Sequence, residues 1–200
     1  MATIAISQQA FANTIIPLME EWGWALEDGI LEYSISNDLM TPEIEIKIQK
    51  AIDAWQKALD KQEYRKIIFK EKDMGDDIQF YYHKGWNDPE YQAYTTNYLD
   101  HNGQIDMSTV AIYEKHNGYK PTSKQMDNTI LHEIGHALSL DHVKNDNMLM
   151  TDNGMPRSKT LKISECDAFA VLEKNMYNLG TENVMCTDHW TSLDQIWAGQ

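Results

Sequence analysis

Residues 131–142 read Leu-His-Glu-Ile-Gly-His-Ala-Leu-Ser-Leu-Asp-His. Side chains four residues apart lie on the same face of a helix, so His132 and His136 can both bind one Zn²⁺ at about 2.0–2.1 Å. His142 follows six residues after His136, which is too far for the same helical face. We therefore expect the helix to end between them and the chain to fold back. Three histidine ligands leave the fourth position of a tetrahedral zinc for water, as in catalytic sites.

Glu133, beside the first histidine, is the candidate general base of such a site. An isolated His-Glu-x-x-His pattern also occurs by chance on helices whose side chains only pack or face solvent. The third histidine at this spacing argues against that alternative.

The composition limits the other classes of function. The 200 residues suit one domain, with or without extensions. A formal net charge of −14 argues against binding to nucleic acid or to an anionic membrane surface. No run of 18 or more apolar residues predicts a transmembrane helix. The first residues lack the pattern of a secretory signal peptide, so the protein stays inside, leaves by another route, or lacks its leader here.

Hydrophobic periodicity and turn residues predict the order of elements. Residues 15–26 favour a short helix or an ordered extension, and residues 85–90 favour a loop. A long amphipathic helix should begin after the N-cap Thr41 and reach Leu59. The helix with the motif should run from Ser123 or Asp127 to Leu140. Strands are expected at residues 30–35, 66–71, 77–82, 91–99 and 104–112. A loop with Met148 and Met150 follows the motif, and a capping pattern at residues 164–167 opens a last helix.

Residues 30–178 resemble the matrixin branch of the metzincin peptidases. Three segments carry the resemblance: residues 132–142, close to His-Glu-x-x-His-x-x-Gly-x-x-His; Met150, where matrixins place the methionine of their Met-turn; and residues 164–172, similar to the closing helix that begins Ser-x-x-Asp. The resemblance implies an α+β, zincin-like fold. It would have a twisted, mostly parallel five-stranded sheet, three main helices, and a cleft between an upper and a smaller lower subdomain. Residues 1–29 would be an N-terminal extension or short prosegment, and residues 179–200 a C-terminal tail.

The function that the resemblance implies is a zinc-dependent endopeptidase. His132, His136 and His142 would hold one catalytic zinc, Glu133 would be the general base, and Met150 would lie beneath the metal as a hydrophobic support. A polypeptide substrate would pair with the strand at residues 91–99. The candidate substrate-binding residues are Tyr94, Thr96 and Asp152. Alternatives are a zinc-binding domain without peptidase activity and a zinc hydrolase acting on non-peptide substrates. Because matrixins are mostly exported, we expect an extracellular protein, with a cytoplasmic one as the alternative.

The sequence also departs from the matrixin pattern. Ser139 stands where the family has glycine, and a left-handed conformation there should cost serine about 1 kcal/mol. Either neighbours hold this turn, or it adopts another conformation. The strands lack the histidines that hold a structural zinc in animal matrixins, and Ca²⁺ is possible but no EF-hand spacing supports it. We assign no metal to the remaining histidines, His83, His101, His116 and His189.

The two extensions suggest two hypotheses about latency. In one, residues 1–29 cover the cleft, with Asp28 or a neighbouring acid on the zinc; in the other, Cys186 binds the metal as thiolate. The simpler alternative is that both extensions pack on the surface. Two cysteines, Cys166 and Cys186, make no disulfide framework, and free thiols are favoured over a single bridge.

Overall fold

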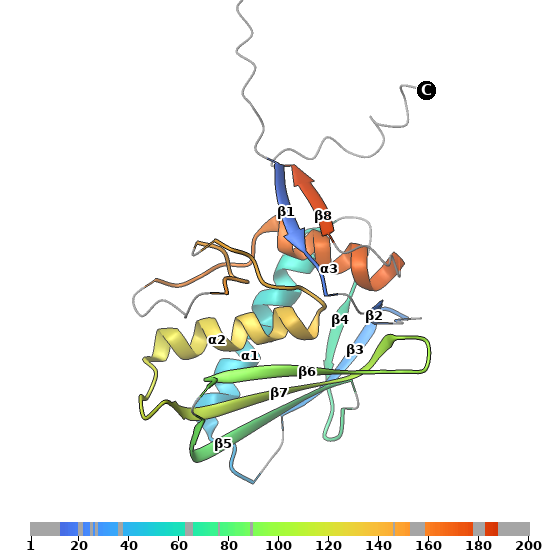
Figure 1. Ribbon diagram of the computed structural model, residues 1–200. Coiled ribbons are helices and arrows are strands. Elements are labelled where there is room, and N and C mark those ends of the chain that lie inside the picture. Colours follow the sequence, from blue (N-terminus) through green and yellow to red (C-terminus); the bar gives the residue numbers. More distant parts are fainter. Residues whose placement is uncertain are drawn as a thin grey trace, which may run out of the picture.

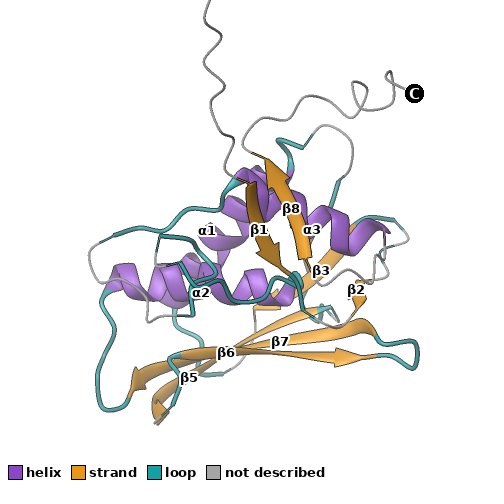
Figure 2. Ribbon diagram, turned by 45° about the horizontal axis from the view of Figure 1, so that its top comes forward, coloured by secondary structure: helices purple, strands orange, loops and turns teal. Residues whose placement is uncertain are grey.

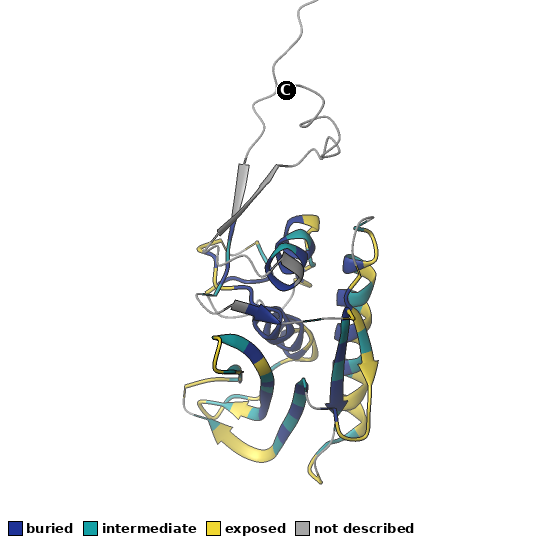
Figure 3. Ribbon diagram, turned by 90° about the vertical axis from the view of Figure 1, so that its right-hand side faces the viewer, coloured by how far each residue is buried: buried dark blue, intermediate teal, exposed yellow. Residues whose placement is uncertain are grey.

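One mostly parallel sheet forms the base of the molecule, and the helices lie on one face of it (Figures 1 and 2). The computed structural model describes residues 13–19, 22–24, 26, 28–35, 38–62, 66–75, 77–88, 90–145, 147–152, 159–177 and 183–187. The helices are α1 (Pro42–Leu59), α2 (Ser123–Ala137) and α3 (Glu165–Tyr177). Buried residues gather where these helices face the sheet and one another (Figure 3).

The sheet has the strand order β2-β7-β5-β3-β4, and β6 pairs with β7. Its strands are β2 (Trp22–Trp24), β3 (Ile30–Ile35), β4 (Ile68–Glu71), β5 (Ile78–Asp88), β6 (Ala93–Leu99) and β7 (Gln104–His116). All neighbours are parallel except β6, which runs antiparallel to β7. A separate two-stranded sheet pairs β1 (Asn13–Pro17) with β8 (Asn183–Thr187).

This architecture confirms the predicted α+β fold with a mostly parallel sheet and three helices. The main sheet has six strands instead of five, because Trp22–Trp24 pairs with the start of β7. Of the two alternatives for residues 15–26, the short helix was wrong, and the segment is an extension that contributes β1 and β2. Their weak helical periodicity is overridden by strand pairing with distant segments. The loop predicted at residues 85–90 was also wrong in part, because β5 continues to Asp88 alongside β7.

Helix α1 fixes the position of α2, which carries the motif. Thr41 caps α1 by accepting a hydrogen bond from the Ile44 N–H, as its sequence predicts. Trp55 is fully buried, and its indole N–H donates to the Leu131 carbonyl, 3.0 Å away.

Within the described residues, none of the helices has the length and apolar character needed to span a membrane.

Cys166, near the start of α3, is buried and disulfide-bonded. The expectation of free thiols was therefore wrong. Cys186 is the only other cysteine of the sequence, so the hypothesis that its thiolate caps the zinc conflicts with this bond.

Candidate metal centre

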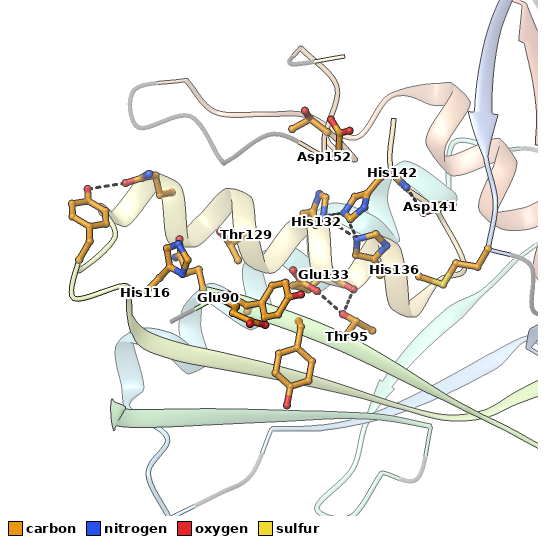
Figure 4. A pocket seen from close by; sticks show the side chains of 18 residues that line it. Glu90, Thr95, His116, Thr129, His132, Glu133, His136, Asp141, His142 and Asp152 are labelled. Carbon is orange, nitrogen blue, oxygen red and sulfur yellow. Dashed lines mark hydrogen bonds between the residues drawn. The ribbon is translucent and has the colours of Figure 1, made fainter. Parts of the chain in front are cut away.

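Helix α2 and the turn after it bring the three motif histidines to one point (Figure 4). The Nε2 atom of His136 lies 2.9 Å from that of His132 and 3.0 Å from that of His142. The remaining Nε2 pair, of His132 and His142, is 3.2 Å apart. Nitrogen ligands around a tetrahedral zinc are separated by about 3.3 Å, given Zn–N bonds of about 2.0–2.1 Å. The histidines are therefore arranged as three ligands of a single ion.

Hydrogen bonds at the Nδ1 atoms of His132 and His136 determine the tautomers of these two rings. Nδ1 of His132 lies 2.8 Å from the Leu149 carbonyl oxygen, and Nδ1 of His136 lies 2.8 Å from that of Leu140. A carbonyl oxygen only accepts hydrogen bonds, so both Nδ1 atoms carry the proton and both Nε2 atoms present lone pairs. Burial lowers the pKa of His132 to about 4 and that of His136 to about 3, which keeps both rings neutral at physiological pH. Lone pairs this close repel one another unless a cation lies between them, so the donor set suits Zn²⁺.

The third histidine reaches this point because the chain reverses after α2. The helix ends at Ala137, earlier than the predicted Leu140, and the Leu140 N–H donates back to the Gly135 carbonyl at 3.0 Å. Ser139 adopts φ 72°, so the left-handed conformation expected for the family's glycine is kept by a serine. The predicted reversal between His136 and His142 is confirmed.

Glu133 points from α2 toward strand β6. Its side chain is buried, and Oε2 lies 2.8 Å from the hydroxyl of Thr95. Burial raises the pKa of Glu133 to about 7, and the hydrogen bond with Thr95 acts in the opposite direction. A carboxyl group with this pKa can exchange a proton near neutral pH, as a general base must.

A cavity of about 680 Å³ opens beside these residues, between α2, β6 and the loop after His142. Tyr94 and Asp152, two of the predicted substrate-binding residues, line it, whereas Thr96 does not. Thr95 of β6 also lines the cavity and reaches Glu133, but the sequence did not single it out. Strand alternation alone does not identify it, because Tyr94 lines the same cavity and shares the strand face of Thr96. The residues that line the cavity, within the described part of the chain, include neither Lys nor Arg.

Met150 is fully buried beneath α2. A Cβ atom added to Gly135 would collide with the Met150 Sδ, so the sulfur packs directly on the helix between the two histidines. The loop is held there because the Val143 N–H donates to the Met150 carbonyl at 2.7 Å. Met150 thus packs on the helix that carries His132 and His136, and its role as the Met-turn residue beneath the metal stays a prediction.

The other described residues considered as possible metal ligands do not join the histidine cluster. The carboxylate of Asp28 accepts a hydrogen bond from the Ile30 N–H at 2.9 Å and does not line the cavity. His83 stacks on Tyr113, and His116 lines the far part of the cavity. Among the described residues, only the three motif histidines form a group able to hold a metal. His189 and most of residues 1–29 fall outside the described residues.

Comparison with known proteins agrees with this geometry. The family model of the matrixins matches residues 24–177, which include strands β3 to β7, the three helices and the histidine cluster. A search among curated proteins found no match.

Proposed function

This chain belongs to the matrixin family, and on that premise we propose that it is a zinc-dependent endopeptidase that hydrolyses peptide bonds. The observation that carries the proposal is the convergence of three Nε2 atoms within 2.9–3.2 Å of one another. The Nδ1–H groups of His132 and His136 are already engaged by backbone carbonyls. Such outer hydrogen bonds orient imidazole ligands and raise their basicity.

In this proposal His132, His136 and His142 hold one zinc ion. Zinc, when bound, polarises the scissile carbonyl and lowers the pKa of a water molecule to about 7. Glu133 accepts the proton of the attacking water and passes it to the leaving amine. Thr95 orients the Glu133 carboxylate, and Met150 supports the helix from below.

The substrate is a polypeptide in extended conformation. Strand β6 pairs with β7 along one edge, and within the described residues its other edge has no strand partner. An extended peptide can add to such an edge through main-chain hydrogen bonds, while pockets select side chains. Tyr94 and Asp152, on the cavity wall, and the backbone at Thr96 are the proposed contacts.

We also propose that the protein works outside the cell. The disulfide at Cys166 supports this, because disulfides persist mainly in oxidising compartments.

Metal analysis combined with cleavage of an unfolded protein tests the proposed function. We expect one zinc per chain, and cleavage that stops on adding a chelator and returns with zinc. Glu133→Gln should keep the metal and lose cleavage, whereas Glu165→Gln, an exposed acid on α3, should retain both. Cleavage by Glu133→Gln at the wild-type rate would contradict the assigned base. A protein that binds zinc but cuts no peptide would instead favour the zinc-binding domain without peptidase activity.

A further inference from the structure

Ser139 occupies a backbone conformation that its own chemistry disfavours. Its φ of 72° lies in the left-handed region, which glycine adopts freely and residues with a Cβ rarely do. The residue is fully buried and stands between His136 and His142. Such a conformation persists only where the surroundings hold it.

The surroundings include the side chain of Asn175, which reaches the turn from α3. Its amide nitrogen donates to the carbonyls of Leu138 and Val171, at 3.0 and 2.8 Å. Its amide oxygen accepts from the Trp24 N–H at 2.8 Å and from the Ser139 hydroxyl at 3.4 Å. Because both donors and the oxygen are engaged, this buried amide has one orientation. It therefore joins the turn to α3 and to β2.

The end of strand β1 supports the same turn from another side. The Met19 N–H donates to the Ser139 carbonyl at 3.0 Å, and the Asp141 N–H donates to the Pro17 carbonyl at 3.1 Å. Leu18 and Leu140 form an antiparallel bridge between these bonds. Residues 17–19 precede the segment that matches the matrixin family. The turn at Ser139 is thus also held by backbone hydrogen bonds from the end of β1.

His142 depends on this support more than the other two histidines do. His132 and His136 are buried on α2, whereas His142 is exposed and follows the turn. Its backbone N–H donates to the carboxylate of its neighbour Asp141, at 2.6 Å. The placement of its ring is therefore set by the path of residues 138–141.

We propose that Asn175 is a positioning residue for the metal centre, which holds the left-handed turn at Ser139 and thereby keeps His142 on the metal. The end of β1 is the second support. The proposal rests on the proposed zinc site, but it assigns a role to residues outside the motif.

The rate of zinc loss to a chromophoric chelator tests this role. Asn175→Ala should accelerate zinc loss about tenfold, the scale seen when partners of metal ligands are removed. Asn128→Ala is the matched control, because this buried asparagine also joins a helix to backbone, through Lys159 and Leu161. It should lower thermal stability without accelerating zinc loss.

Two further variants separate positioning from general destabilisation. Ser139→Gly removes the need for support, so Asn175→Ala in that background should accelerate zinc loss much less. Gly23→Ala leaves Asn175 unchanged but places a Cβ 2.6 Å from its Oδ1 and 2.7 Å from the Lys174 carbonyl oxygen. By displacing this part of α3 it should accelerate zinc loss as Asn175→Ala does.

Hydrogen exchange of metal-free protein gives a readout that does not need zinc. Asn175→Ala should increase exchange at the amides of Leu140 and Asp141, whereas Asn128→Ala should not. Equal zinc loss and equal exchange in Asn175→Ala and wild type would overturn the inference, as would an undiminished effect in the Ser139→Gly background. A wild-type protein that binds no zinc would overturn the proposed function itself, while the exchange comparison would still decide whether Asn175 holds the turn.

Discussion

The hydroxyl of Thr95 lies 2.8 Å from the Glu133 Oε2 and 2.9 Å from the backbone carbonyl oxygen of the same residue. A hydroxyl has one proton, so it donates to only one of these atoms at a time. When the carboxylate is ionised, Thr95 can donate to it. When the carboxyl is protonated, it can donate to Thr95, which then donates to the carbonyl. One side chain therefore partners Glu133 in both of its protonation states.

Replacing this hydroxyl should impair catalysis without removing the metal. Thr95→Val keeps the shape but leaves the buried Glu133 carboxylate without this donor. Hydrogen bonds to charged groups are worth about 1.5–3 kcal/mol, so we expect kcat/KM to fall about tenfold or more. The acid limb of the pH profile should move to higher pH, since the bond with Thr95 lowers the pKa of Glu133.

Thr95→Ser is the matched control and should restore most of the activity, because it returns the hydroxyl. Both variants should bind zinc as wild type does. An unchanged pH profile in Thr95→Val would show that the hydroxyl does not act on Glu133.

The sequence predicts those features whose causes are local. The N-cap at Thr41 and the metal-ligand spacing from His132 to His136 each involve residues within one or two helical turns, and the structure has both. The supports of the site come from far along the chain. Asn175 and Trp24, which meet behind the metal turn, are 151 residues apart. No local pattern marks a side chain whose partners are brought together only by the fold.

Strand ends illustrate the same limit. Gly85, Asn87 and Asp88 predict a loop, but pairing of Asn87 with Lys115 and Asp88 with His116 extends β5. Trp22–Trp24 is too short to stand out as a strand, and it joins the sheet because β7 offers an edge. The bounds of β5 and the presence of β2 are therefore set by pairing with β7, not by the strand propensity of their own residues.

The metal-free protein should become less stable as pH rises through the titration of Glu133. Burial raises the pKa of Glu133 from 4.5 to about 7 in the folded protein. The folded state therefore holds a proton between pH 4.5 and 7 that the unfolded state has released, and above pH 7 it must bury a carboxylate. Glu133→Gln removes this cost, so it should gain up to about 3 kcal/mol over wild type at pH 8 and almost nothing at pH 4.

Urea unfolding in the presence of a chelator, at both pH values, measures this difference. The comparison with wild type cancels the titration of the histidines, which both proteins share. A gain that is the same at pH 4 and pH 8 would contradict the raised pKa.

The negative charge of the cavity lining should favour substrates with basic side chains over those with acidic ones. Glu90, Asp141 and Asp152 line the cavity at exposed positions, and Lys and Arg are absent from its described lining residues. Peptides with arginine near the scissile bond should be cut faster than otherwise identical peptides with glutamate. This preference should shrink between 50 and 500 mM salt (about 14 and 4 Å of screening length), because exposed charges are screened over about 10 Å at 0.1 M.

Asp152→Asn should reduce the same preference, whereas Asp38→Asn, exposed and outside the cavity lining, should not. The measurement is kcat/KM for the peptide pair at each salt concentration. Equal values for the two peptides at low salt would exclude an electrostatic contribution to specificity.

Gly135 and Met150 should behave as a coupled pair. Alanine is favoured over glycine inside a helix by about 1 kcal/mol, so Gly135→Ala on a free surface would stabilise α2. Here the added Cβ would collide with the Met150 Sδ and contact the Trp55 ring at 3.4 Å. Overpacking of this kind costs about 1–3 kcal/mol, so we expect a net loss of stability.

Met150→Ala alone should also destabilise the protein, because it leaves a cavity. Combining them should cost less than the sum, since the shortened side chain makes room for the new methyl group. A double-mutant cycle by chemical denaturation measures this coupling. Additive losses of unfolding free energy would show that the Met150 sulfur does not contact α2 at Gly135.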